Sequence, residues 1–229
     1  MEKILVVAAH PDDEVLGCGG AMAKHTAAGD EVRVVFLAEG ITARFDPKEF
    51  DRDDVVEASK NRNQNALKAL KVLGVPEDSV YLNERYCCRL DQVPIIDLVK
   101  EIERHIAEFQ PTRLFTHAAY DANVDHGRAH QAMITAIRPI GRDFLKLVMT
   151  FEVLSSTEWN PAAPFQPNYF TDITDYMDLK LEALAAYGDE FRSAPHPRSK
   201  EVLSGLARYR GAQIGVMFAE GFNLIRAKD

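Results

Sequence analysis

Imidazole and carboxylate side chains gather at two places in this 229-residue sequence. The first group, His10, Asp12, Asp13 and Glu14, follows a short apolar run. The second group lies about a hundred residues later and comprises His117, Asp121, Asn123, Asp125, His126 and His130. Neutral nitrogen and anionic oxygen are ligands that suit a divalent metal such as zinc, which keeps one position open for water in catalytic sites. If the two groups meet in the fold, the sequence predicts a metal centre.

Asp12 and Asp13 also have a simpler explanation, because either could cap a helix that begins there. Capping needs only one acid, however, and three consecutive acids after a His-Pro pair repel one another unless a cation compensates them. The charge argument therefore favours a functional role. His126 and His130 are four residues apart and share one face of a helix, a spacing that can chelate a metal. Because single helix histidines are more often ordinary residues, we do not assign His130 as a ligand.

Dinucleotide binding is the competing interpretation. Gly17-Cys18-Gly19-Gly20 follows the first strand, and Glu39 lies 22 residues after Gly17, near the place of a ribose-binding acid. The glycines come eight residues after Ala9, however, and the acids would stand where a pyrophosphate needs the helix N-terminus. We expect the glycines to let this helix pack closely on the sheet. A non-catalytic nucleotide-binding protein is kept as the alternative from a different class.

Arg62 falls on the apolar stripe of its predicted helix, in line with Ala66, Leu70 and Leu73. A charge in that place requires a partner. The arginine could reach the surface or pair with a structural acid, or it could bind substrate at the edge of a pocket. The sequence leaves both explanations open.

The elements that must position these residues alternate between strands and helices. Apolar runs predict strands over 4–9, 32–37, 79–82, 112–116 and 147–154. Helical patterns cover 14–28, 58–73, 93–109 and 125–137, with two more near 176–187 and 199–209. This order predicts a single α/β domain over 1–229, with a Rossmann-like, mostly parallel sheet that has helices on both faces. We expect an α/β core over about 1–154 and a C-terminal helical cap over about 155–229.

Composition narrows the class and the partners. The net charge of −8 argues against a general nucleic-acid binder, which needs a basic face. No apolar run approaches the roughly 20 residues of a membrane span, so none is expected. The three cysteines lack a metal-type spacing and cannot form a disulfide framework, which fits a cytoplasmic location. The sequence does not decide between a monomer and a homo-oligomer.

Several motifs resemble the LmbE-like (PIG-L) family of zinc-dependent N-acetylglucosaminyl deacetylases. The motifs are Ala9-His10-Pro11-Asp12-Asp13-Glu14, the glycines that follow it, and Asn123-Val124-Asp125-His126. Weaker matches are Arg62, Leu73-Gly74, Ser155-Ser156-Thr157-Glu158-Trp159 and Pro195-His196-Pro197-Arg198-Ser199. The resemblance covers most of the chain and implies a deacetylase-like fold.

By this resemblance, His10, Asp13 and His126 bind Zn²⁺, and Asp12 is the general base. A site of this kind also accepts Fe²⁺ or Co²⁺. The implied reaction removes the N-acetyl group from an N-acetylglucosamine-type sugar or sugar conjugate and releases acetate. Within the same fold, an amidase that cleaves a larger acyl group from an amino-sugar conjugate is the alternative.

Asn123 departs from the family pattern, because many members have a histidine at this position. Asparagine can donate a hydrogen bond to an oxyanion but cannot deliver a proton at neutral pH. The proton for the leaving amine must then come from protonated Asp12, from His117 or from His196.

Other residues are expected to orient the residues of the site or to bind the substrate. We expect Asp125 to orient a neighbouring group. The expected substrate-binding residues are Arg62, Glu14, Asp121 and Arg198. The aromatic faces of Tyr86, Tyr120 and Trp159 are further candidates for contact with a sugar ring.

Overall fold

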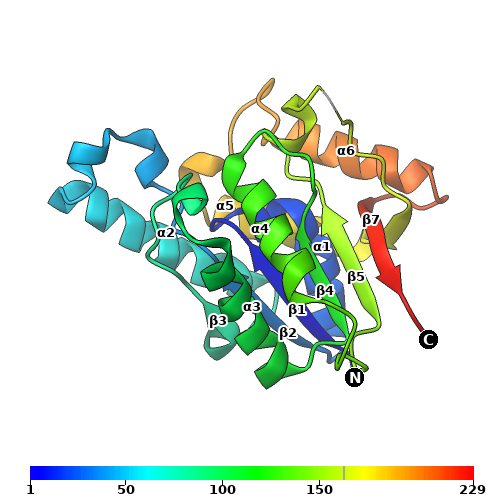
Figure 1. The fold of residues 1–229 in the computed structure, drawn as a ribbon. Coiled ribbons are helices and arrows are strands. Elements are labelled where there is room, and N and C mark those ends of the chain that lie inside the picture. The colour runs from blue at the N-terminus through cyan, green and yellow to red at the C-terminus, as the bar shows by residue number, and fades with distance from the viewer. Residues whose placement is uncertain (162) are drawn as a thin grey trace.

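A seven-stranded sheet lies at the centre of the computed structural model, which describes residues 1–161 and 163–229 (Figure 1). Ala162, in the Pro- and Ala-rich segment 160–168, lies outside the described residues. The strands are β1 (Lys3–Ala8), β2 (Glu31–Phe36), β3 (Val80–Tyr81), β4 (Arg113–His117), β5 (Leu147–Phe151), β6 (Tyr169–Asp172) and β7 (Ala219–Ala227). Their order in the sheet is β3-β2-β1-β4-β5-β7-β6.

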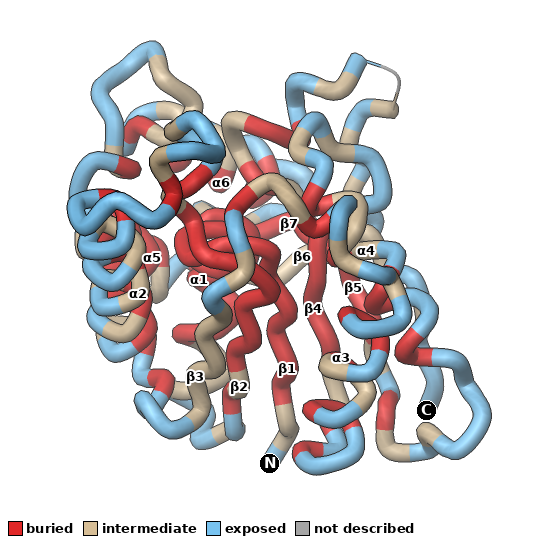
Figure 2. The backbone as a smooth tube through the Cα atoms, turned by 60° about the vertical axis from the view of Figure 1, so that its left-hand side comes forward, coloured by how far each residue is buried: buried red, intermediate tan, exposed pale blue. Residues whose placement is uncertain are grey.

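The first five strands run parallel, and β1 is the central strand among them. Residues Ile4–Ala8 of β1 are fully buried, as expected of a strand that is covered on both faces (Figure 2). Because β1 pairs with β2 on one side and with β4 on the other, the order of strands reverses between β1 and β4. Open α/β sheets bind ligands at this reversal, outside the carboxyl ends of the strands.

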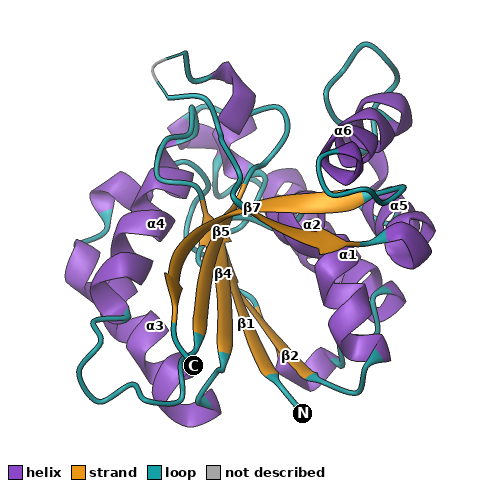
Figure 3. Cartoon of the chain, turned by 90° about the vertical axis from the view of Figure 1, so that its right-hand side faces the viewer, coloured by secondary structure: helices purple, strands orange, loops and turns teal. Residues whose placement is uncertain are grey.

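Helices cover both faces of the sheet (Figure 3). The helices are α1 (Asp13–Ala27), α2 (Asp53–Val72), α3 (Ile95–Phe109), α4 (Val124–Ala136), α5 (Met177–Ala185) and α6 (Lys200–Ala212). Side chains of α1, α2, α5 and α6 share one apolar core with Ile4 and Val6, whereas α3 and α4 share a second core with Leu5 and Val7. Alternate residues of β1 therefore face the two layers, and the predicted Rossmann-like α/β architecture is confirmed. Within the described ranges, no helix has both the length and the apolar character that crossing a membrane requires.

The glycines of α1 bring this helix against the sheet. A Cβ atom on Gly17 would lie 2.3 Å from the ring of Phe151, and one on Gly20 would lie 2.8 Å from Ile173. The prediction that the glycines serve close packing is confirmed, since a larger side chain has no room at either position.

The helix α1 is interrupted at Cys18, whose φ of −147° is not helical. Buried Glu220 accepts the backbone N–H groups of Gly20 and Ala21 at 2.9 and 2.7 Å, and Lys180 donates to the carbonyl oxygen of Leu16 at 2.9 Å. These contacts satisfy backbone groups at the interruption. Residues from the last third of the chain thus support the helix that carries Asp13.

The last third of the chain contributes two strands to the sheet, in addition to the predicted helical cap. The predicted helices are present as α5 and α6, but β7 also pairs antiparallel with β5, and β6 pairs antiparallel with β7. Gly221 and Asn223 lie in the middle of β7, where they weaken the strand pattern in the sequence. Pairing with β5 and the burial of Phe222 outweigh this low local preference.

Candidate metal centre

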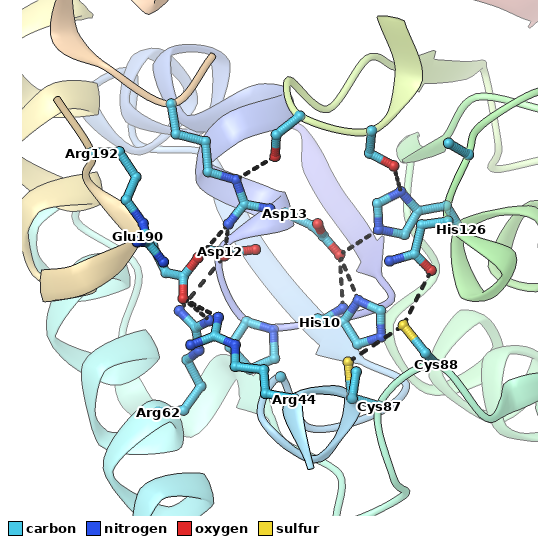
Figure 4. A pocket seen from close by; sticks show the side chains of 18 of the residues that line it. His10, Asp12, Asp13, Arg44, Arg62, Cys87, Cys88, His126, Glu190 and Arg192 are labelled. Carbon is cyan, nitrogen blue, oxygen red and sulfur yellow. Dashed lines mark hydrogen bonds and ion pairs between the residues drawn. The ribbon is translucent and has the colours of Figure 1, made fainter. Parts of the chain in front are cut away.

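A cavity of about 440 Å³ opens at the carboxyl ends of the parallel strands (Figure 4). Its walls come from the loops that follow the five parallel strands, from residues of α1, α2 and α4, and from the segment between α5 and α6. The side chains that line it include His10, Asp12, Asp13, Arg44, Arg62, Asn123, His126, Ser156, Trp159, Glu190, Arg192, His196 and Arg198. A metal centre required the two polar groups of the sequence to meet, and His10, Asp12 and Asp13 of the first group lie here with Asn123 and His126 of the second.

His10, Asp13 and His126 form the candidate ligand set, with one donor atom from each lying within 4.8 Å of the others. Oδ2 of Asp13 lies 3.4 Å from Nδ1 of His10 and 3.3 Å from Nε2 of His126. All three residues are buried. Two imidazole nitrogens and one carboxylate oxygen around a common point are donors that could hold a divalent metal ion.

Each ligand histidine has a carboxylate on its other ring nitrogen. Nε2 of His10 lies 2.9 Å from Oδ2 of Asp125, and Nδ1 of His126 lies 3.1 Å from Oδ2 of Asp121. When these nitrogens donate to the carboxylates, Nδ1 of His10 and Nε2 of His126 keep their lone pairs toward Asp13. Metal-binding histidines are oriented in this way in proteins, so the residues present fit a divalent cation.

The local charge also favours a cation between the two rings. Burial alone would lower the pKa of His10, but its hydrogen bonds with Asp125 and Asp13 raise that pKa to about 10. Burial likewise opposes the charged form of His126, but the nearby Asp13 and the hydrogen bond with Asp121 raise its pKa to about 9. Burial would also raise the pKa of Asp13, but the histidines hold it well below its usual value. The carboxylates therefore stabilise positive charge at this point.

Asp12 lies beside the ligand set, at the N-cap of α1, with a φ of 119° in the left-handed region. This conformation is strained for a residue other than glycine. The Asp12 carboxylate lines the cavity, and its Oδ2 lies 2.7 Å from Nη1 of Arg198 and 3.6 Å from Nη1 of Arg62. Burial raises the pKa of Asp12, although the two guanidinium groups oppose that shift. A buried carboxylate with a raised pKa, placed in a cavity, is suited to proton transfer.

Glu14 does not line the cavity, where a substrate-binding residue would lie. Its side chain is fully buried, where Oε1 accepts the hydroxyl of Tyr187 at 2.5 Å and Oε2 accepts the backbone N–H of Asp12 at 2.9 Å. Both carboxylate oxygens are thus engaged inside the protein. The geometry corrects the sequence expectation, because Glu14 holds the strained backbone of Asp12 instead of facing the cavity.

Asp121 is also directed inward. Its carboxylate pairs with His126 and accepts the hydroxyls of Thr157 and Ser156 and the backbone N–H of Asn123. These four donors leave it oriented toward the protein, with a side chain that is 0% exposed. The expected contact with substrate is replaced by a role in orienting His126.

His117 lies beneath the ligand set. Its Nε2 accepts the backbone N–H of Ala9 at 2.8 Å, and its ring stacks on His126 with 4.0 Å between centroids. Complete burial, followed by the charge of His126, lowers the pKa of His117 well below its usual value. A neutral, fully enclosed ring cannot supply a proton to a substrate in the cavity, which removes His117 from the acid candidates. His130 hydrogen-bonds the His117 carbonyl at 2.9 Å, away from the ligand set.

Three further residues of the sequence analysis line the cavity: Asn123, His196 and Trp159. Asn123 caps α4, where its Oδ1 accepts the backbone N–H of Asp125 at 2.9 Å. This contact leaves the Nδ2 amide of Asn123 as the group that can donate into the cavity. Nδ1 of His196 accepts the backbone N–H of Arg198 at 3.1 Å.

Arg62 has the partner that its position on the apolar stripe required. Its Nη2 donates to Oε1 of Glu190 at 2.6 Å, while Nη1 of Arg198 lies 2.6 Å from Oε2 of the same carboxylate. Arg44 pairs with Glu190 as well. The sequence analysis did not single out Glu190, Arg44 or Arg192. The only signal was the buried charge of Arg62, and its partner lies 128 residues away along the chain.

The features that suggested a dinucleotide have other roles. Glu39 accepts the backbone N–H groups of Ile41, Thr42 and Cys87 at 2.6 to 3.0 Å and so closes two loops against each other. The glycines lie inside a packed helix, as described above. Neither Glu39 nor these glycines line the cavity that holds His10, Asp13 and His126.

Comparison with known proteins agrees with this geometry. The family model described as PIG-L, GlcNAc-PI de-N-acetylase, matches residues 5–137. The diacetylchitobiose deacetylase of Thermococcus kodakarensis is 24% identical over 231 residues, which cover 98% of this chain and 84% of the relative. A 4-oxalmesaconate hydratase of Pseudomonas putida is 28% identical over 191 residues, which cover 80% of this chain and 72% of the relative.

Among solved structures, the N,N'-diacetylchitobiose deacetylase of Pyrococcus horikoshii has the same fold. The TM-score is 0.77 at 23% identity, and the match covers 98% of this chain and 84% of that one. The family match spans more than half of the chain and includes His10, Asp13 and His126. The chain therefore belongs to the PIG-L (LmbE-like) deacetylase family.

Proposed function

We propose that this protein is a metal-dependent hydrolase that removes the N-acetyl group from an N-acetylglucosamine-type sugar or sugar conjugate and releases acetate. The observation that carries the proposal is the pair of carboxylate–histidine contacts around Asp13, with the Asp12 carboxylate in the same cavity. The proposed ion is Zn²⁺, and the same donors accept Fe²⁺ or Co²⁺.

The ion would be held by Nδ1 of His10, Oδ2 of Asp13 and Nε2 of His126. A divalent ion bound there lowers the pKa of a water molecule and polarises a carbonyl group. Asp12 accepts the proton of the attacking water, since burial favours the protonated form of its carboxyl group. Arg198 and Arg62 orient the Asp12 carboxylate for this transfer.

The remaining steps use groups on the cavity wall. Oxygen from water forms the new bond to the acetyl carbon, and Nδ2 of Asn123 donates to the oxyanion. The carbon–nitrogen bond then breaks as the proton taken by Asp12 passes to the amine nitrogen, which leaves acetate and a free amino sugar. His196 lines the same cavity and is the second candidate for this proton donor, but its lowered pKa favours Asp12.

The names of the relatives support a deacetylase reaction and point to a hydratase reaction as the alternative. Two of them are named as deacetylases of diacetylchitobiose, whereas the third is named as a hydratase. Both chemistries use a water molecule, so acetate is the product that separates them. An amidase for a larger acyl group is the alternative on the same residues.

The test combines elemental analysis with an acetate assay. Wild type, Asp13→Ala and His126→Ala are prepared without chelator, beside Asp143→Asn as a matched control, whose side chain is fully exposed. We expect about one zinc or iron per chain in wild type and control, with the metal lost in both ligand variants. Metal-loaded wild type should release acetate from N-acetylglucosamine glycosides. Wild type that binds no metal after reconstitution would overturn the proposal, and faster release of longer acyl groups would favour the amidase.

We also propose a reducing compartment such as the cytosol for this protein, because Cys18, Cys87 and Cys88 are free thiols.

A single domain over residues 1–229 is proposed because β7, near the C-terminus, pairs with β5 in the same sheet as β1. Sedimentation of the purified protein tests whether it forms a homo-oligomer.

A further inference from the structure

Four guanidinium groups line the cavity, and we call them the arginine wall: Arg44, Arg62, Arg192 and Arg198. Figure 4 shows Arg44, Arg62 and Arg192 on the side of Asp13 away from His126. The chain as a whole carries a net charge of −8, so this concentration of arginine is opposite in sign to the rest of the protein. Positive charge that exceeds the negative charge in its surroundings attracts ligands of the opposite sign.

The arginine wall holds more positive charge than its own carboxylates neutralise. Arg62 and Arg198 each pair with both Asp12 and Glu190, and Arg44 pairs with Glu190. These two carboxylates therefore serve three arginines. Arg192 makes no ion pair with any residue in 1–161 or 163–229, although it is exposed and lines the cavity.

The pKa of the neighbouring His196 is affected by the same excess of positive charge. His196 lies between Arg192 and Arg198 in the sequence and lines the cavity with both of them. Burial lowers the pKa of His196, and the charges of Arg198 and Arg192 lower it further. The positive potential thus extends across this part of the cavity.

Arg44 and Arg192 have donors that can reach a ligand. Arg44 contacts Glu190 through Nη2, and its side chain is 46% exposed. The planar guanidinium fork matches the oxygens of carboxylates and phosphates, and such charge-assisted hydrogen bonds are stronger than neutral ones. A neutral sugar offers only uncharged oxygens to these donors, which gives weaker hydrogen bonds than a carboxylate or a phosphate.

We propose that the substrate carries an anionic substituent, a carboxylate or a phosphate, on its N-acetylglucosamine unit, and that Arg192 and Arg44 bind this group. The inference rests on the proposed function and narrows its substrate class. Arg62 and Arg198 hold Asp12 and Glu190, whereas Arg192 and Arg44 select the substrate.

The test compares three glycosides that differ in charge. They are methyl N-acetyl-α-glucosaminide, which is neutral, N-acetyl-α-glucosamine 1-phosphate, and the α-glycoside of glycolic acid, which carries a carboxylate. Acetate release is measured for wild type, Arg192→Gln, Arg44→Gln and Arg138→Gln. Arg138 is the matched control, because its side chain is 70% exposed and pairs with Glu103, away from the cavity lining.

We expect at least one anionic glycoside to exceed the neutral one by about 10- to 100-fold in kcat/KM, mainly through KM. The preferred anion identifies the substituent as phosphate or carboxylate. Arg192→Gln should reduce this preference by about tenfold or more, and added salt should weaken it, whereas Arg138→Gln should keep it. Equal kcat/KM for neutral and anionic glycosides in wild type would overturn the inference, as would an unchanged preference in both cavity variants.

A calorimetric arm separates this inference from the proposed function. If none of the three glycosides releases acetate from metal-loaded protein, the proposed function fails. Binding of the same compounds to wild type and Arg192→Gln then decides the anion site. Tighter binding of an anionic glycoside that is lost in Arg192→Gln supports the site, and equal binding of all three compounds overturns it.

Discussion

Asp125 holds the ring of His10 in one orientation, with Oδ2 of the carboxylate 2.9 Å from Nε2 of the imidazole. The other carboxylate oxygen, Oδ1, accepts the backbone N–H of Leu90 at 2.9 Å. Asp125 is thus fixed from one side by a loop and fixes His10 on the other. Its position directs Nδ1 of His10 toward Asp13, where a metal would be bound.

This contact predicts that Asp125→Asn weakens metal binding while the ligands themselves are unchanged. The two donors contact different oxygens of Asp125, so in asparagine one of them faces an NH2 group, which cannot accept its hydrogen bond. Loss of such a supporting carboxylate lowers metal affinity by about 10- to 100-fold. Competition with a chromophoric zinc chelator measures the change, with Asp143→Asn as the control. Unaltered affinity in Asp125→Asn would show that the contact does not orient the ligand.

Asp12→Asn should separate catalysis from metal binding. Asparagine keeps the size of the side chain but cannot accept a proton, so kcat should fall by about 10²- to 10⁴-fold. The metal content should match that of wild type, because Asp12 lies outside the ligand set. Steady-state acetate release and elemental analysis on the same sample provide the two readings. A variant that retains full kcat would exclude Asp12 as the general base.

Metal affinity should rise with pH. In the metal-free protein the pKa of His10 is raised to about 10 and that of His126 to about 9. The metal binds only neutral rings. At a pH below these pKa values, metal binding therefore displaces the protons of both histidines. The apparent affinity should increase by about tenfold per pH unit for each proton displaced. Zinc competition titrations at about pH 6, 7 and 8 measure the slope, and an affinity that does not vary over this range would contradict it.

Gly17→Ala should destabilise the fold, because its new Cβ would overlap the buried ring of Phe151. We expect a loss of about 1–3 kcal/mol in the free energy of unfolding. Gly205→Ala is the matched control, since a Cβ at this helical position meets nothing within 4 Å. It should stabilise α6 by about 0.5–1 kcal/mol. Urea denaturation of both variants without metal tests the pair, and equal stabilities would argue against close packing at Gly17.

Local sequence patterns were sufficient to predict the parallel part of the fold and the kind of site. The continuous apolar run of β1 and the helical periodicity of α3 are visible in the local sequence, and their burial follows from the layered architecture. The rule that ligands bind at the carboxyl ends of strands predicted the place where members of both polar groups line one cavity. The position of Arg62 on an apolar stripe predicted a partner, because a buried charge needs one.

Only the tertiary structure decided which polar side chains face the cavity. Glu14 and Asp12 are close in the sequence, yet one is enclosed by Tyr187 and the other lines the cavity. The pairing of β7 with β5 was hidden in the same way, because Gly221 and Asn223 interrupt its pattern. These outcomes depend on contacts between residues far apart in the chain. Such contacts set burial and hydrogen bonding without leaving a periodic signal in the local sequence.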